Sequence, residues 1–143
     1  MLLPQIVDIQ DIFGSDYRDI ERYMSVMTMG NKIKDDNIII KYGEEVAKIQ
    51  NSSSSFAQSP FVEFTLYQAY LNKEELENAL NIIESLNTVE LNKQTRSRQK
   101  YLLGTILSKL WRGEEAQKAY QEAIDADASS AWAKLAKSAK EDI

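Results

Sequence analysis

Apolar residues recur at intervals of three and four along most of this chain, and that spacing places them on one face of an α-helix. The segment from Asp35 to Gln50 shows the pattern clearly. Its apolar residues are Ile38, Ile39, Tyr42, Val46 and Ile49. Only five Gly and two Pro interrupt the 143 residues, and no alternating run of strand length appears. The pattern therefore predicts an all-α fold.

Short turn signals separate the apolar segments and predict seven helices. Their expected ranges are 17–31, 35–50, 60–72, 74–87, 95–111, 114–126 and 130–142. An apolar lead-in of residues 1–14 precedes them, and the low-complexity run 51–55 is expected to be a loop. Paired helices with turns of two to four residues form antiparallel hairpins, and we expect these hairpins to stack and bury their apolar faces against one another.

Residues that cap helix ends set the expected boundaries. Pro60 favours a helix start because its missing N–H would have no intrahelical partner at the first position. A side-chain oxygen just before a helix accepts a free N–H of its first turn. The expected N-cap residues are Ser15 or Asp16, Asp35 or Asp36, Ser59 and Ser129. The pair Gly30-Asn31 is expected to end a helix, because both residues tolerate a positive φ.

Composition excludes several kinds of chemistry. Cys and His are both absent, which rules out disulfides, the usual zinc sites and nucleophiles that depend on Cys or His. Paired acidic residues occur at expected helix starts, where they complement the helix dipole and need no catalytic role. There is no phosphate-binding Gly loop and no GxSxG elbow. We therefore expect no enzyme activity, no cofactor and no bound metal.

Charge and hydropathy limit the classes of partner. The net charge of −5 argues against binding of nucleic acid or anionic lipid by the whole domain. No apolar run reaches the roughly 20 residues that cross a bilayer, so no membrane insertion is expected. Lack of Cys fits the cytoplasm and a bacterial periplasm equally well. The compartment stays open, and a protein partner is the expected kind of ligand.

The segment Tyr101–Asp127, YLLGTILSKLWRGEEAQKAYQEAIDAD, alternates small and bulky residues over two expected helices. It resembles the tetratricopeptide repeat, a degenerate helix-turn-helix unit of about 34 residues. The matching positions are Leu103, Gly104 and Leu107 in the first helix, and Ala116, Tyr120 and Ala123 in the second. The segment departs from the pattern where Trp111 replaces a turn Gly, Lys100 a large residue, and Ala128 a terminal Pro.

The resemblance extends to the rest of the chain with less consensus. It implies a right-handed solenoid of about three antiparallel hairpins with a C-terminal capping helix, in one domain over residues 1–143. Residues 60–127 hold two repeats, residues 128–143 the capping helix, and residues 1–59 a degenerate hairpin region. The lead-in fits the last helix of a preceding repeat.

Members of the family hold ligands in a concave groove lined by the first helix of each hairpin. Transferring those positions to this sequence gives a face that is half aromatic and half basic. The candidate groove residues are Phe61, Phe64, Gln68, Leu71, Arg98, Tyr101, Thr105 and Lys109. Two interpretations remain open: the aromatic residues contact a partner, or they pack as ordinary core.

One segment of this acidic chain is basic. No acidic residue lies between Glu90 and Glu114. The candidate basic patch consists of Lys93, Arg96, Arg98, Lys100 and Arg112. It can steer an acidic partner, or it can be a solvated face balanced by acids of the neighbouring helix. Both interpretations stay open.

Two functions follow from the resemblance. In the first, the chain is a non-catalytic module that holds a peptide or helix of a protein partner in its groove. In the second, it is a structural segment of a larger multiprotein scaffold, for example in a bacterial envelope or flagellar motor, and contacts partners through its ends or convex face. Arrays usually need at least about three repeats. Self-association is therefore a further expectation.

Overall fold

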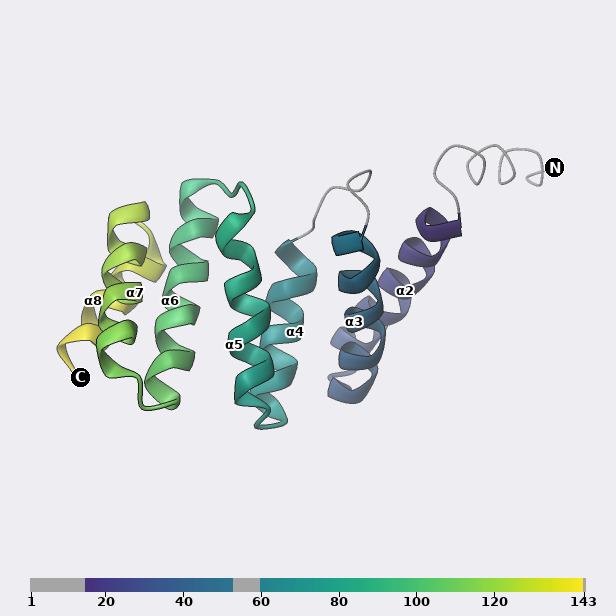
Figure 1. Cartoon of the computed structure of the whole chain (residues 1–143), viewed down its shortest axis with the longest axis horizontal. Coiled ribbons are helices and arrows are strands. Elements are labelled where there is room, and N and C mark those ends of the chain that lie inside the picture. Colours follow the sequence, from purple (N-terminus) through teal and green to yellow (C-terminus); the bar gives the residue numbers. More distant parts are fainter. Residues whose placement is uncertain (1–14, 53–59, 143) are drawn as a thin grey trace. The chain divides into compact units, whose positions relative to one another are not determined.

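The structure, a computed structural model, describes residues 15–52 and 60–142, and these are all-helical as the sequence predicts (Figure 1). In this part of the chain the helices are α2 (Ser15–Lys32), α3 (Asp36–Ser52), α4 (Pro60–Asn72), α5 (Leu76–Glu84), η1 (Ser85–Thr88, a 3-10 helix), α6 (Lys93–Lys109), α7 (Gly113–Ala126) and α8 (Ala131–Glu141). The lead-in 1–14, the expected cap Ser59 and residues 53–55 of the expected loop lie outside the described residues.

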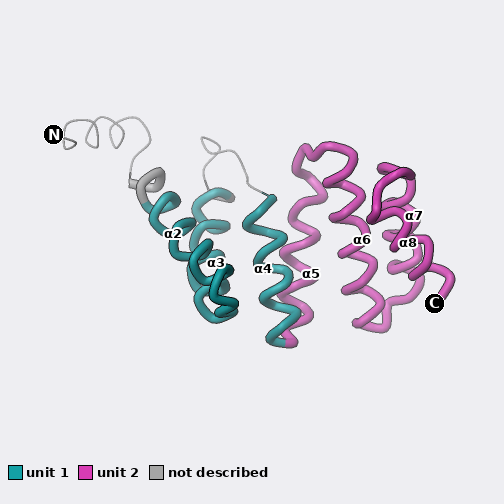
Figure 2. Tube along the Cα trace, turned by 180° about the vertical axis from the view of Figure 1, so that it is seen from behind, with its two compact units in different colours: residues 1–73 teal, residues 74–143 magenta. Residues whose placement is uncertain are grey.

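The chain divides into two compact units (Figure 2). Unit 1, residues 1–73, contains α2, α3 and α4, and in it α3 packs against both α2 and α4. Unit 2, residues 74–143, contains α5, η1, α6, α7 and α8. In unit 2, α6 packs against α5, α7 and α8, so it is the central helix of that unit.

Helix α2 ends later than the sequence suggests. Gly30 does not stop the helix, which runs on to Lys32. A Cβ added at Gly30 would lie 2.7 Å from Cγ2 of Ile38, so the missing side chain lets α2 and α3 approach closely. The expected stop at Gly30-Asn31 is therefore wrong, because packing rather than backbone conformation accounts for this glycine. The start of α3 agrees with the prediction, since Oδ1 of Asp35 accepts the N–H of Ile38 at 3.2 Å.

The same turn conformation follows three of the helices. Lys34 after α2, Glu74 after α4 and Trp111 after α6 have φ values of 58°, 60° and 61°. Residues other than glycine adopt this left-handed conformation at a cost of about 1–2 kcal/mol. The side chain of Trp111 is 94% exposed, so its packing does not offset that cost.

Unit 2 depends on a close approach of α6 and α7. A Cβ added at Gly104 would lie 2.5 Å from Cδ1 and Cε1 of Tyr120. The Tyr120 ring therefore occupies the space that any larger residue at position 104 would need. Ala116 and Ala123 on the same side of α7 are fully buried. Small residues on one helix and a ring on the other fill the narrow gap between the two axes.

The boundaries of α6 and α8 differ from the expected ones. Asn92 caps α6, because its Oδ1 accepts the N–H of Thr95 at 2.8 Å, and the helix begins at Lys93 rather than at residue 95. Ser130, not Ser129, caps α8 through the N–H of Ala133 at 3.0 Å. A contact with α6 explains why Ser130 is the cap, because its Oγ also lies 2.8 Å from the buried Oγ of Ser97.

We expect Gly104→Ala to lower the free energy of unfolding by about 1–3 kcal/mol, because the new Cβ overlaps the Tyr120 ring. Urea unfolding followed by circular dichroism measures the change. Ser138→Ala introduces the same residue at an exposed position of α8 and serves as the control. An equal stability of Gly104→Ala and the parent chain would show that the helices can separate without loss.

We expect Trp111→Gly to raise the free energy of unfolding by about 1 kcal/mol, because glycine adopts φ 61° without the steric cost of a Cβ. Trp111→Ala removes the exposed ring but keeps the Cβ, so its free energy of unfolding should rise much less. The midpoint of thermal unfolding compares the three chains. Equal gains in both variants would assign the effect to the indole ring and not to the backbone.

Candidate functional site

Helix α6 carries half of the candidate groove residues along one face. Arg98, Tyr101 and Thr105 are half-buried, and Lys109 at the end of the helix is exposed. Spacings of three and four place the four residues in one row. Thr105 bonds its own helix, because its Oγ1 donates to the Tyr101 carbonyl at 3.0 Å. Arg98 and Tyr101 therefore offer the larger surfaces of this row.

An aromatic cluster joins α6 to α7 and α8. The centroid of the Tyr101 ring lies 6.0 Å from that of Tyr120 in α7 and 6.0 Å from that of Trp132 in α8. The Arg98 Cζ lies 5.3 Å from the centroid of the Trp132 ring. Tilted ring pairs at this distance contribute about 0.5–1.5 kcal/mol each beyond their burial. The cluster therefore fixes Tyr101 and Trp132 in defined positions.

The ionisable groups of the cluster respond to burial. Burial lowers the pKa of the Arg98 guanidinium, because desolvation disfavours its charge, and the Trp132 ring face offsets part of that loss. Burial also raises the pKa of the Tyr120 phenol, against a smaller lowering by its hydrogen bond with Thr105. Tyr120 is therefore neutral at physiological pH, and Arg98 contributes the positive charge of the cluster.

Helix α8 adds residues that the sequence analysis did not assign to the groove. Trp132 is half-buried and Leu135, one turn further, is 48% exposed. Their spacing repeats that of Arg98 and Tyr101 in α6, and this repetition is the signal that could have found them. We call Arg98, Tyr101, Thr105, Trp132 and Leu135 the α6–α8 face.

The other candidate groove residues belong to α4 in unit 1. Phe61 is 40% exposed, whereas Phe64 is 7% exposed and cannot contact a partner unless its neighbours move. Leu71 is half-buried and Gln68 is exposed. The Gln68 Nε2 donates to Oδ1 of Asn72 at 2.9 Å. Phe61 and Gln68 are therefore the accessible members of this set.

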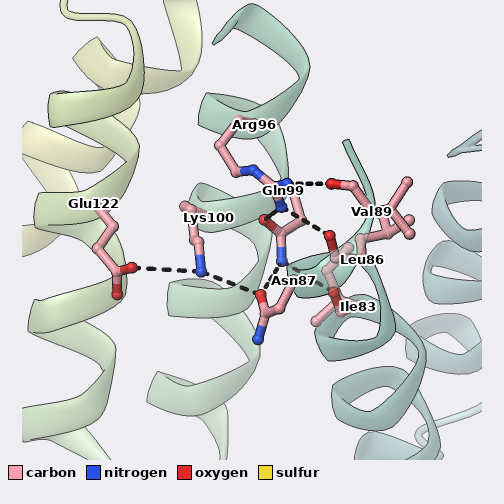
Figure 3. Close-up of polar contacts among 8 residues, drawn as sticks. All are labelled: Ile83, Leu86, Asn87, Val89, Arg96, Gln99, Lys100 and Glu122. Atoms are coloured by element: carbon pink, nitrogen blue, oxygen red, sulfur yellow. Dashed lines mark hydrogen bonds and ion pairs between the residues drawn. The ribbon is translucent and has the colours of Figure 1, made fainter. Parts of the chain in front are cut away.

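The structure uses Arg96 of the candidate basic patch to hold the connector between α5 and α6 (Figure 3). Its guanidinium donates to the carbonyls of Leu86, at 2.8 Å, and Val89, and to Oε1 of Gln99 at 3.0 Å. Carbonyls at the end of a helix lack intrahelical donors, and the Arg96 guanidinium donates hydrogen bonds to them instead. Arg96 therefore stabilises the fold of unit 2.

Gln99 completes this network from inside unit 2. Its side chain is fully buried, and its Nε2 donates to the Ile83 carbonyl at 3.1 Å and to Oδ1 of Asn87 at 2.7 Å (Figure 3). With the bond from Arg96 to its Oε1, both ends of the amide have partners. The buried amide thus ties α6 to the end of α5 and to η1.

Most other residues of the candidate basic patch have partners within unit 2. The Lys100 Nζ lies 3.1 Å from Oδ1 of Asn87 and 3.4 Å from Oε2 of Glu122 in α7 (Figure 3). Arg112 donates twice to the Glu115 carboxylate, at 2.9 and 2.6 Å. This pairing raises the pKa of Arg112 and lowers that of Glu115. For Lys100 and Arg112, acids of α7 supply the balancing charge.

Within 15–52 and 60–142, no group of three or more acidic side chains could hold a metal ion. No helix in these ranges is both long and apolar enough to span a membrane. Comparison with protein-family models and with curated protein sequences gave no match.

We expect Arg96→Met to lower the free energy of unfolding by about 1–3 kcal/mol, because the carbonyls of Leu86 and Val89 lose their donor. Lys93→Met removes the same charge from an exposed position of the same helix and is the matched control, with an expected change within about 0.5 kcal/mol. Urea unfolding curves measure both. Equal losses in the two variants would assign the effect to charge and not to the network.

Proposed function

We propose that this chain is a non-catalytic protein-binding module of the tetratricopeptide-repeat type, and that the α6–α8 face is its working surface. The observation that carries the proposal is the position of Trp132, half-buried beside Tyr101 and Arg98 with Leu135 exposed one turn further. Trp, Tyr and Arg are the residues most enriched among those that dominate binding energy. Their presence on one face supports partner contact.

Rigidity of the cluster favours binding. Each of the two rings is held by its neighbours, so ordering them on binding costs little conformational entropy. Leu135 adds apolar surface that a partner can remove from water. The ligand that fits is a peptide or helix with an apolar residue that packs on Leu135.

The recurring turn supports the repeat architecture in the proposal. The three left-handed residues that follow α2, α4 and α6 divide the chain into similar helix-turn-helix units. The close contact of Gly104 with Tyr120 matches the small and bulky positions of the repeat. A right-handed solenoid of such units is part of the proposal, and Phe61 and Gln68 are the accessible candidate groove residues of α4.

A second function is favoured by the position of Trp111. Its indole is 94% exposed at the turn between α6 and α7, and it is not a residue of the α6–α8 face. Met29 and Ile33 are also exposed, at the end of α2 and just after it. Apolar residues at turns suit a segment of a larger scaffold that contacts neighbours through its edges.

The proposal is tested by selecting binders from a defined library of peptides with the purified full chain and titrating the tightest binder. We expect Leu135→Lys to weaken binding at least tenfold, because it places a charge where apolar contact is needed, and Trp132→Phe to weaken it less. Lys134→Ala alters an exposed neighbour on α8 and should leave the affinity unchanged.

Unchanged affinity in Leu135→Lys would contradict the α6–α8 face as the binding surface. If that variant binds normally and Trp111→Ala does not, the edge contacts of the scaffold function are supported in its place. Circular dichroism of each variant shows whether it is folded, so that loss of structure is not taken for loss of binding.

A further inference from the structure

A hollow of about 470 Å³ lies between α7 and α8, on residues that the α6–α8 face does not use. It is lined by Gln121 and Ile124 from α7 and by Lys137, Lys140 and Glu141 from α8. The Lys140 Nζ donates to Oε1 of Gln121 at 2.6 Å and ties the two helices together at the hollow. Ile124 and the methylene stems of the two lysines supply its apolar surface.

The packing of α7 on α6 shows which charges occur on a helix that covers a basic helix in this chain. Helix α6 contains five basic residues and no acidic one. Helix α7, which packs along it, contains four acidic residues and one basic residue. Lys100 and Glu122 join the two helices as an ion pair at 3.4 Å. In this pair of helices, a basic helix is therefore covered by an acidic amphipathic one.

Helix α8 repeats the charge of α6. Its basic residues Lys134, Lys137 and Lys140 outnumber its one acidic residue, Glu141. Among the described helices, α7 and α6 pack against α8, and the hollow is lined by residues of α7 and α8. A helix placed there would meet Ile124, the two lysines Lys137 and Lys140, and one acidic residue, Glu141.

We propose that the hollow between α7 and α8 docks an acidic amphipathic helix of a partner protein. An apolar residue of that helix packs over Ile124 and the stems of Lys137 and Lys140, and its flanking carboxylates pair with the two amines. A second copy of α8 would place lysine against lysine at the rim, and like charges there oppose association. The surface is separate from the α6–α8 face.

The test uses a designed helical peptide with a leucine stripe flanked by glutamates, and a matched peptide in which lysines replace the glutamates. Fluorescence anisotropy measures the binding of each labelled peptide to the full chain. We expect the acidic peptide to bind at least tenfold more tightly than the basic one. The preference should weaken with added salt, because salt screens the charge of the exposed Lys137.

Two substitutions locate the peptide. Lys137→Glu should weaken binding of the acidic peptide at least tenfold and improve binding of the basic one, because it inverts the charge at the rim. Ile124→Ser should weaken both. Lys118→Glu makes the same charge change at an exposed position of α7 outside the hollow and should have little effect. Leu135→Lys should leave the affinity unchanged, which separates this surface from the α6–α8 face.

Several outcomes would overturn the inference: equal binding of both peptides, no binding of either, or unchanged affinity in Lys137→Glu. Light scattering over a tenfold concentration range addresses a different occupant. A molar mass that doubles in the parent chain and stays constant in Ile124→Ser would show that the hollow is filled by a second copy. That result would replace the partner helix with a homodimer.

Discussion

Hydrogen bonds buried under α6 determine how the helices of unit 2 can meet. The Ser97 hydroxyl donates to the Ala123 carbonyl at 2.8 Å, and the Ser130 Oγ lies 2.8 Å from the Ser97 Oγ while it accepts the N–H of Ala133 as the cap of α8. In the same turn of α6, Arg96 donates to the Leu86 carbonyl and Gln99 to the Ile83 carbonyl, where α5 and η1 end. A buried polar group without a partner costs about 1–3 kcal/mol. A shift of one helix along another would break these bonds and destabilise unit 2. The aromatic cluster and the hollow both depend on the register of these helices.

Local signals predicted the helices well, because periodicity, caps and turn residues act over a few positions. The all-α fold and the cap at Asp35 are of this kind. The predicted stop at Gly30-Asn31 and the predicted cap at Ser129 are wrong because tertiary contacts decide both: Gly30 lies against Ile38, and Ser130 is the cap and contacts Ser97. The spacing of residues within one helix cannot predict these contacts, because each of them involves a residue of a second helix.

The candidate site shows the same division. The row Arg98, Tyr101 and Thr105 follows from spacing along one helix, and the structure places these residues together. The candidate basic patch was predicted from charges that lie close together in the sequence. In the structure these charges have different partners: Arg96 donates to a backbone carbonyl, and Lys100 and Arg112 pair with acidic residues of α7. Trp132 joins the site only because α8 packs back on α6. Charge density along a chain does not reveal which cations are already paired.

The positions of the two tryptophans determine what tryptophan fluorescence can report about unfolding. Both lie in unit 2, Trp111 in water and Trp132 against Tyr101 and Arg98. Indole emission therefore follows the environment of Trp132 alone when unit 2 unfolds, while helical ellipticity follows both units. Agreement of the two optical signals would indicate one cooperative transition, and disagreement would indicate that the halves melt separately. The chain thus carries an intrinsic probe for one half and none of the same kind for the other.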